Sequence, residues 1–234
     1  MSVATFLQVP KFLYDCIAYV LSPPLCFSCR AHTPFRVILC SRCEDSLDYI
    51  APKMFQLNDT YILTVYAVSR YTEPLRPMLF AKYRSDPVVL EKVAELIWKK
   101  SVVSLVKIDC FVPIPLHWTR IVKRGFNQSE LIAERLSDYS KSTPSFIPVI
   151  HALKRVRRTE YQVRVEQVDR RCNVKGAFEL DKLDVETIKK HITGKHIMLV
   201  DDSCTTGSTA IEAARVFVKF KPASINMVVA CRAL

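Results

Sequence analysis

The alternation of apolar and polar residues after position 60 predicts short strands separated by amphipathic helices. Apolar runs of strand length occupy 61–68, 108–113, 174–180, 196–200 and 224–230, and apolar residues at helical spacing occupy 87–100, 127–137 and 208–220. Strands that alternate with helices are typical of a mostly parallel sheet flanked by helices. The pattern therefore predicts an α/β fold for residues 60–234.

The residues before position 60 follow a different pattern and are predicted to form a smaller module. Apolar residues at helical spacing over 6–21 end at Pro23 and Pro24, so a helix is expected there. A cysteine-rich unit spans 26–43, and 44–58 is interpreted as a connecting segment. We place the domain boundary near Thr60, with 1–59 as the N-terminal module and 60–234 as the α/β domain.

Composition excludes several classes of protein. Among 234 residues, 50% are hydrophobic and 24% are charged, which is ordinary for a globular chain and excludes disorder as the dominant state. No apolar run reaches the roughly 18 to 20 residues of a membrane span. Asp15 interrupts the apolar stretch that a secretory signal would need. We therefore expect a cytoplasmic protein with no membrane span.

The charge of the chain favours anionic partners. With 34 basic and 23 acidic residues, the formal net charge is +11, which attracts polyanions. Residues 151–175 hold eight Lys or Arg against three acidic residues. This stretch could be a hood that closes over a phosphorylated ligand, a groove for a nucleic-acid backbone, or a solvated loop. For the second interpretation the candidate nucleic-acid-binding residues are Arg155, Arg157, Arg158 and Arg164.

Four of the nine cysteines form two identical pairs. Cys26 and Cys29 make one C-x2-C hook, and Cys40 and Cys43 make another ten residues further on. A gap of two residues lets both sulfurs of a hook bind one tetrahedral ion, and two hooks complete a closed four-sulfur site. The spacing therefore predicts a structural Zn2+ ion. Four of the other cysteines, Cys16, Cys110, Cys172 and Cys231, are interpreted as small buried side chains. Cys204 lies in the motif described next, where a nucleophilic thiol near a helix N-terminus is the alternative to a buried one.

The strongest chemical signal lies near residue 200. A predicted strand runs into the acidic pair Asp201 and Asp202, and the loop Ser203-Cys-Thr-Thr-Gly-Ser-Thr209 then leads into a helix. Backbone N–H groups, hydroxyls and the positive end of a helix dipole together can bind one phosphate. Neither the dinucleotide fingerprint nor the P-loop is present. We expect a phosphate site beyond the carboxyl end of this strand.

These residues carry a resemblance to known families. Val200-Asp-Asp-Ser-Cys-Thr-Thr-Gly-Ser-Thr209 resembles the phosphoribosyl pyrophosphate (PRPP) motif of type I phosphoribosyltransferases. Together with this motif, three further segments resemble the ComF/ComFC competence family, including its GntX-like members. They are Pro113-Ile-Pro-Leu-His117, Arg124-Gly-Phe-Asn-Gln128, and Gln162 with Arg170 and Asn173 before Gly176-Ala-Phe178. That family combines an N-terminal four-cysteine zinc finger with a phosphoribosyltransferase domain.

The resemblance implies roles for the site residues. Asp201 and Asp202 would accept hydrogen bonds from the ribose hydroxyls of PRPP and balance an oxocarbenium-like centre. Mg2+ and nearby cations would neutralise the pyrophosphate leaving group, and Lys82 and Arg124 are the candidate catalytic cations. Arg120 and Lys123, on the same segment as Arg124, could reach the same phosphates. The PRPP-binding loop would comprise Ser203, Thr205, Thr206, Gly207, Ser208 and Thr209.

Three functions remain open at this point. The family role implies a natural-transformation protein that binds PRPP with Mg2+ and handles single-stranded DNA beside other competence or recombination proteins. A second possibility is a salvage phosphoribosyltransferase that acts on a free nucleobase. The third is a DNA-binding scaffold that keeps the fold without catalysis. The sequence identifies no acceptor pocket, so whether the chain is an enzyme is left undecided.

Overall fold

The computed structural model describes residues 24–34, 37–81, 87–157, 175–181 and 185–233. The chain divides into two compact units, Met1–Ser46 and Leu47–Leu234. The helix expected over 6–21 lies outside the described residues, as do Lys82, Arg158 and Arg164. Residues 47–59 are grouped with the second unit.

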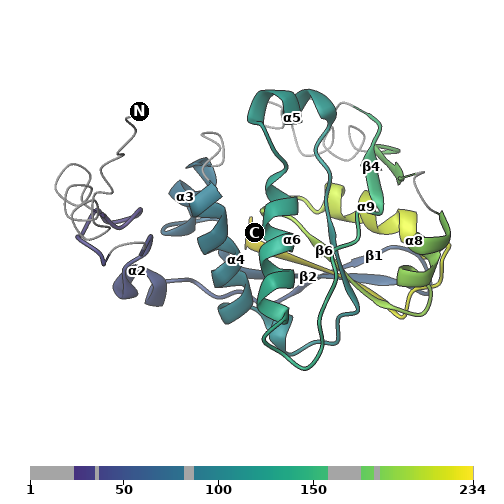
Figure 1. Cartoon of the computed structure of the whole chain (residues 1–234), viewed down its shortest axis with the longest axis horizontal. Coiled ribbons are helices and arrows are strands. Elements are labelled where there is room, and N and C mark those ends of the chain that lie inside the picture. Colours follow the sequence, from purple (N-terminus) through teal and green to yellow (C-terminus); the bar gives the residue numbers. More distant parts are fainter. Residues whose placement is uncertain (1–23, 35–36, 82–86, 158–174, 182–184, 234) are drawn as a thin grey trace, which may run out of the picture. The chain divides into compact units, whose positions relative to one another are not determined.

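The second unit is built on a mixed sheet in which most strands run parallel (Figure 1). Its strand order is β1-β2-β8-β6-β3, and the short β7 pairs with β8. Among the described strands of this sheet, only β1 is antiparallel to its neighbour. The bounds are β1 Lys53–Gln56, β2 Ile62–Arg70, β3 Cys110–Pro113, β6 His196–Val200, β7 Ser203–Cys204 and β8 Ser224–Arg232. This architecture confirms the predicted α/β class.

Helices cover both faces of this sheet. On one face α4 (Pro87–Lys100) contacts β2 and β8, and α6 (Gln128–Ser140) contacts β3 and β6. On the other face α9 (Ser208–Val218) joins the main apolar cluster through Ala210, Ala213, Ala214 and Phe217. Ile192, at the end of α8 (Val185–Ile192), belongs to the same cluster.

The strands are rich in apolar residues because both faces of the sheet are buried. In β6, Ile197 and Leu199 belong to the cluster beneath α9, whereas the alternating Met198 and Val200 are equally buried. Since successive side chains of a strand point to opposite faces, the second pair packs on the side of α6. A continuous apolar run is thus the expected signature of this strand, and its bounds are those that the sequence predicted.

Short elements complete the two units. A two-stranded antiparallel sheet joins β4 (Leu153–Arg155) to β5 (Phe178–Leu180), and β5 is shorter than the strand expected over 174–180. The remaining elements are α2 (Ser41–Asp45) in the first unit, and α3 (Leu75–Ala81), η2 (Val102–Ser104) and α5 (Trp118–Arg124) in the second. Within the described ranges, every helix is too short or too polar to cross a bilayer.

Candidate functional site

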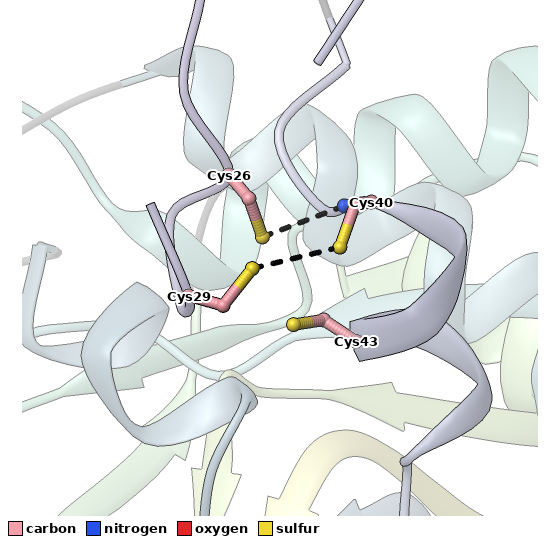
Figure 2. Close-up of side chains that lie close together, drawn as sticks. All are labelled: Cys26, Cys29, Cys40 and Cys43. Atoms are coloured by element: carbon pink, nitrogen blue, oxygen red, sulfur yellow. Dashed lines mark hydrogen bonds between the residues drawn. The ribbon is translucent and has the colours of Figure 1, made fainter. Parts of the chain in front are cut away.

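The first unit gathers the four predicted metal ligands around one point. The thiol sulfurs of Cys26, Cys29, Cys40 and Cys43 all lie within 4.8 Å of one another, and Figure 2 shows them converging. The Sγ atoms of Cys29 and Cys40 are 3.7 Å apart. A tetrahedral zinc ion with Zn–S bonds of about 2.3 Å places its sulfurs about 3.8 Å apart. The cluster is therefore consistent with a structural zinc site.

Local backbone geometry brings the two hooks together. The first hook is a tight turn in which the N–H of Arg30 donates to the carbonyl of Cys26, and Arg30 has a left-handed φ of 63°. The second hook begins at Cys40, the residue directly before α2. Cys43 lies on the buried side of that helix. The backbone N–H of Cys40 also points to the sulfur of Cys26 at 3.5 Å, which fixes one hook against the other.

The electrostatics of the cluster favour a cation. Burial and the neighbouring sulfurs raise the pKa of the Cys43 thiol to about 12. Burial opposes the charged form of Cys26 too, but hydrogen bonds from the backbone of Cys40, Cys29 and Ser28 lower its pKa to about 6. Protein groups alone therefore stabilise one thiolate and disfavour another. A divalent ion would supply the positive charge that four converging thiolates require.

The acidic pair of the second unit lies at the carboxyl end of β6. Asp201 follows Val200 directly and Asp202 is buried, with 8% of its surface exposed. Two backbone hydrogen bonds tie the pair to β8, because the N–H of Asp201 donates to Val228 and the N–H of Ala230 donates to Asp202. The pair therefore sits on a central strand with a fixed backbone, where ligands of open α/β sheets bind.

Side-chain hydrogen bonds orient both carboxylates. The Ser129 hydroxyl, buried at the start of α6, donates to Oδ1 of Asp201 at 2.7 Å, and the N–H of Asp202 donates to the same oxygen at 2.9 Å. The Ser203 hydroxyl donates to Oδ1 of Asp202 at 2.7 Å. The sequence did not single out Ser129. Its only signal was its place directly after the Arg124-Gly-Phe-Asn-Gln128 motif.

The loop after the acidic pair has the form expected of a phosphate site. Gly207 caps α9 in a left-handed conformation, φ 82°, without a side-chain hydrogen bond. The hydroxyls of Thr206 and Ser208 lie 2.9 Å apart, and Thr205 is exposed. Loop hydroxyls and the first-turn N–H groups of an eleven-residue helix thus gather at one place.

An aromatic residue that the sequence did not identify packs on this loop. A Cβ at Gly207 would lie 2.7 Å from Cε1 and 3.0 Å from Cε2 of the Phe55 ring. Phe55 belongs to β1, in a segment that the sequence interpreted as a connection, and Lys53 Nζ lies 5.7 Å from the centre of its ring. Gly207 is therefore required twice, once for its φ and once for the close approach of Phe55.

Cys204, inside the same motif, has the chemistry of a structural thiol. It is 5% exposed. Burial first, and the charge of Asp201 second, raise its pKa to about 11. A thiol with this pKa stays protonated at neutral pH and is a poor nucleophile, so Cys204 serves the packing of the loop.

The predicted cationic residues differ in their position and in their exposure to solvent. Arg124 is the last residue of α5, on the segment that follows β3. Arg157 is exposed, and its Nη1 donates to the carbonyl of Lys175 at 3.2 Å. Arg155, assigned with Arg157 to nucleic-acid binding, is instead buried, with 9% of its surface exposed. The two arginines therefore differ in exposure, and their assignment to nucleic-acid binding stays a prediction.

Comparison with known proteins places the chain in a family. No protein-family model matches it, but curated proteins do. It is 30% identical over 173 residues to the DNA utilization protein YhgH of Escherichia coli, covering 71% of each chain. It is 26% identical over 213 residues to competence protein F of Haemophilus influenzae, covering 87% of this chain and 82% of that protein.

A third relative is competence protein ComFC of Bacillus subtilis, which is 34% identical over 116 residues, covering 49% of this chain and 41% of that protein. These relatives agree with the family that the sequence motifs predicted, and the four-cysteine cluster agrees with its N-terminal module. The chain therefore belongs to the family of YhgH and the competence proteins ComF and ComFC.

Proposed function

We propose that the chain binds PRPP with Mg2+ at the end of β6 and uses this site in the handling of single-stranded DNA. One observation carries the PRPP part. The acidic pair, half-buried Asp201 and buried Asp202, leads directly into a hydroxyl-rich loop whose glycine caps α9. Carboxylates suit the two hydroxyls of a ribose, and the loop suits a phosphate group, so one sugar phosphate satisfies both.

Magnesium fits the same site through its chemistry. Mg2+ prefers oxygen ligands and is commonly held by one or two carboxylates together with the phosphates of the ligand. Asp201 and Asp202 supply carboxylate oxygens at the edge of the sheet. A bound Mg2+ would offset the charge of a pyrophosphate group, while the serines that donate to Asp201 and Asp202 would hold the carboxylates in place.

The DNA part rests on relatives and on charge. YhgH is named a DNA utilization protein and two other relatives are named competence proteins. Arg157 is exposed beside β4, and Arg158 and Arg164 follow it in the most basic stretch of the chain. Contacts of such residues with phosphates would position a single strand without reading its sequence.

The proposal is tested by calorimetric titration of PRPP into the protein in the presence of Mg2+. Wild-type protein is expected to bind, and an Asp201→Asn, Asp202→Asn double variant is expected to lose binding while it keeps the wild-type unfolding temperature. Asp59→Asn, on an exposed turn before β2, is the control. Absence of binding by folded wild-type protein would contradict the proposal. Pyrophosphate release in the presence of free nucleobases would establish turnover as well.

A further inference from the structure

The second unit contains a buried arginine on the short strand β4. Arg155 lies on β4, where Leu153 and Arg155 are buried and Lys154 between them is exposed. The alternation of a strand thus turns Arg155 inward with Leu153. A charged side chain is rarely buried to this extent unless it is paired or serves a site, so the surroundings of Arg155 bear on its role.

The course of the chain brings Arg155 to the edge of the sheet that carries Asp201. Val149 forms a parallel bridge with Phe111 of β3, so the segment leading to β4 runs in the same direction as β3 and β6. Because parallel strands end at the same edge, Arg155 lies beyond the carboxyl end of β3, as Asp201 lies beyond that of β6. Figure 1 shows β4 and α5 in the same upper part of the view.

The guanidinium of Arg155 is held from one side by an aromatic ring. Arg155 lies opposite Phe178 in the β4–β5 pair, and its Cζ is 5.2 Å from the centre of that ring. Phe178 is itself buried, with 5% exposed. A cation over an aromatic face is stabilised by about 0.5–2 kcal/mol. Because the N–H donors of a guanidinium lie in its plane, a ring that covers its face leaves these donors available for hydrogen bonds. Phe178 therefore fixes the position of the group without neutralising it.

Two other charges act on Arg155, and they have opposite signs. Burial lowers its pKa to about 10, the positive charge of Arg120 on α5 lowers it as well, and the negative charge of Asp201 raises it. Arg155 therefore keeps its proton at neutral pH. The guanidinium of Arg155 is thus close enough to both Asp201 and Arg120 to be influenced by their charges. A phosphoryl group near Arg155 would be attracted by both cations.

We infer that Arg155 binds a phosphoryl group of the sugar-phosphate ligand at Asp201, with Arg120 as the second cation, rather than the backbone of DNA. The inference rests on the proposed PRPP site and adds a binding residue to it. The chemistry that these two cations recognise is that of a phosphoryl anion. The pyrophosphate and the 5-phosphate of PRPP both present it, and the choice of probe distinguishes them.

The test compares Arg155→Met and Arg155→Lys with Arg157→Met, which removes an exposed arginine two positions away. The probes for calorimetry are PRPP, ribose 5-phosphate and pyrophosphate, each with Mg2+, and anisotropy measures a single-stranded oligonucleotide. Arg155→Met is expected to weaken PRPP binding about ten- to a hundred-fold, the range of a charge-assisted hydrogen bond. Arg155→Lys keeps the charge without the planar fork and should weaken it less.

The other probes show which phosphoryl group Arg155 binds. If Arg155 holds the pyrophosphate, the variants lose affinity for PRPP and pyrophosphate but keep it for ribose 5-phosphate; the reverse selectivity identifies the 5-phosphate. Arg157→Met is expected to leave PRPP affinity unchanged. PRPP affinity that stays at the wild-type value in both Arg155 variants would overturn the inference. Equal losses for PRPP and DNA would overturn it too. Failure of wild-type protein to bind PRPP would instead refute the proposed function on which the inference rests.

Discussion

Replacing Gly207 by alanine tests how the phosphate loop is built. The substitution adds a Cβ at a left-handed φ of 82°, which costs an L-residue about 1–2 kcal/mol. The same Cβ would also meet the Phe55 ring, 2.7 Å from Cε1 and 3.0 Å from Cε2, whereas carbon atoms pack best at about 3.5–4.0 Å. Overpacking of this kind costs about 1–3 kcal/mol. Gly207→Ala is therefore expected to lower the free energy of unfolding by about 2–5 kcal/mol.

Gly125 provides the matched control. It has a φ of 84°, and nothing lies within 4 Å of where its Cβ would stand. Gly125→Ala should therefore lower the free energy of unfolding only by the cost of the left-handed φ, about 1–2 kcal/mol. In a Phe55→Ala background the ring is absent, so the cost of Gly207→Ala should also fall to about 1–2 kcal/mol. The difference between the two backgrounds measures the contact between Phe55 and the loop.

Urea unfolding of the four proteins of this double-mutant cycle, with Gly125→Ala beside them, supplies the free energies. Calorimetry with PRPP and Mg2+ shows whether the contact also shapes the ligand site. We expect Gly207→Ala to weaken PRPP binding beyond its effect on stability, because the loop must move away from Phe55. A cost for Gly207→Ala that is the same with and without Phe55, or equal to that for Gly125→Ala, would refute this explanation of the loop.

Four further predictions concern other parts of the chain. Purified protein should carry one zinc ion per chain, and Cys26→Ser should lose it and unfold the first unit, which metal analysis and proteolysis would show; a zinc-free but folded wild type would contradict the site. Ser129→Ala removes the 2.7 Å hydrogen bond to Asp201 and should weaken PRPP binding about three- to ten-fold, while Ser142→Ala, on an exposed turn, should change nothing. Charge reversal at Arg157 and Arg158 should weaken binding of single-stranded DNA, and in anisotropy titrations the slope of log K against log[salt] should become shallower by about 1.4, because each phosphate contact contributes about 0.7; PRPP binding should be unaffected. Urea midpoints should fall as pH rises from 9 towards 11. Burial raises the thiol pKa of Cys110 to about 12 and that of Cys204 to about 11, whereas in the unfolded state these thiols have a pKa near 9.0, so the folded state keeps protons that the unfolded state releases. Cys204→Ala should reduce this fall.

The sequence predicted best where a local pattern and burial agree. The bounds of α4 and β6 match because each is a single periodic or continuous apolar run that packs against the rest of the unit. The acidic pair, the phosphate loop and the four cysteines were found because each is contiguous or regularly spaced in the sequence. Features that depend only on neighbouring residues can therefore be recognised from the sequence alone.

Other parts of the site depend on contacts between distant segments. β1 has four residues, and it exists because it pairs with β2; nothing in its sequence indicates that Phe55 meets Gly207. Ser129 reaches Asp201 across 72 positions of the chain. Arg155 was grouped with its basic neighbours because charge density was the only signal, whereas the alternation of β4 turns it inward. Strand pairing and side-chain direction decide these cases, and both require the fold.

The most direct measurement of the central claim is an experimental structure of the protein with PRPP and Mg2+ bound. We expect the 5-phosphate to lie against the loop 205–209, with the ribose hydroxyls at Asp201 and Asp202 and one phosphoryl group of the ligand within hydrogen-bond distance of Arg155. A ligand bound elsewhere, or an empty acidic pair at saturating PRPP, would contradict the claim.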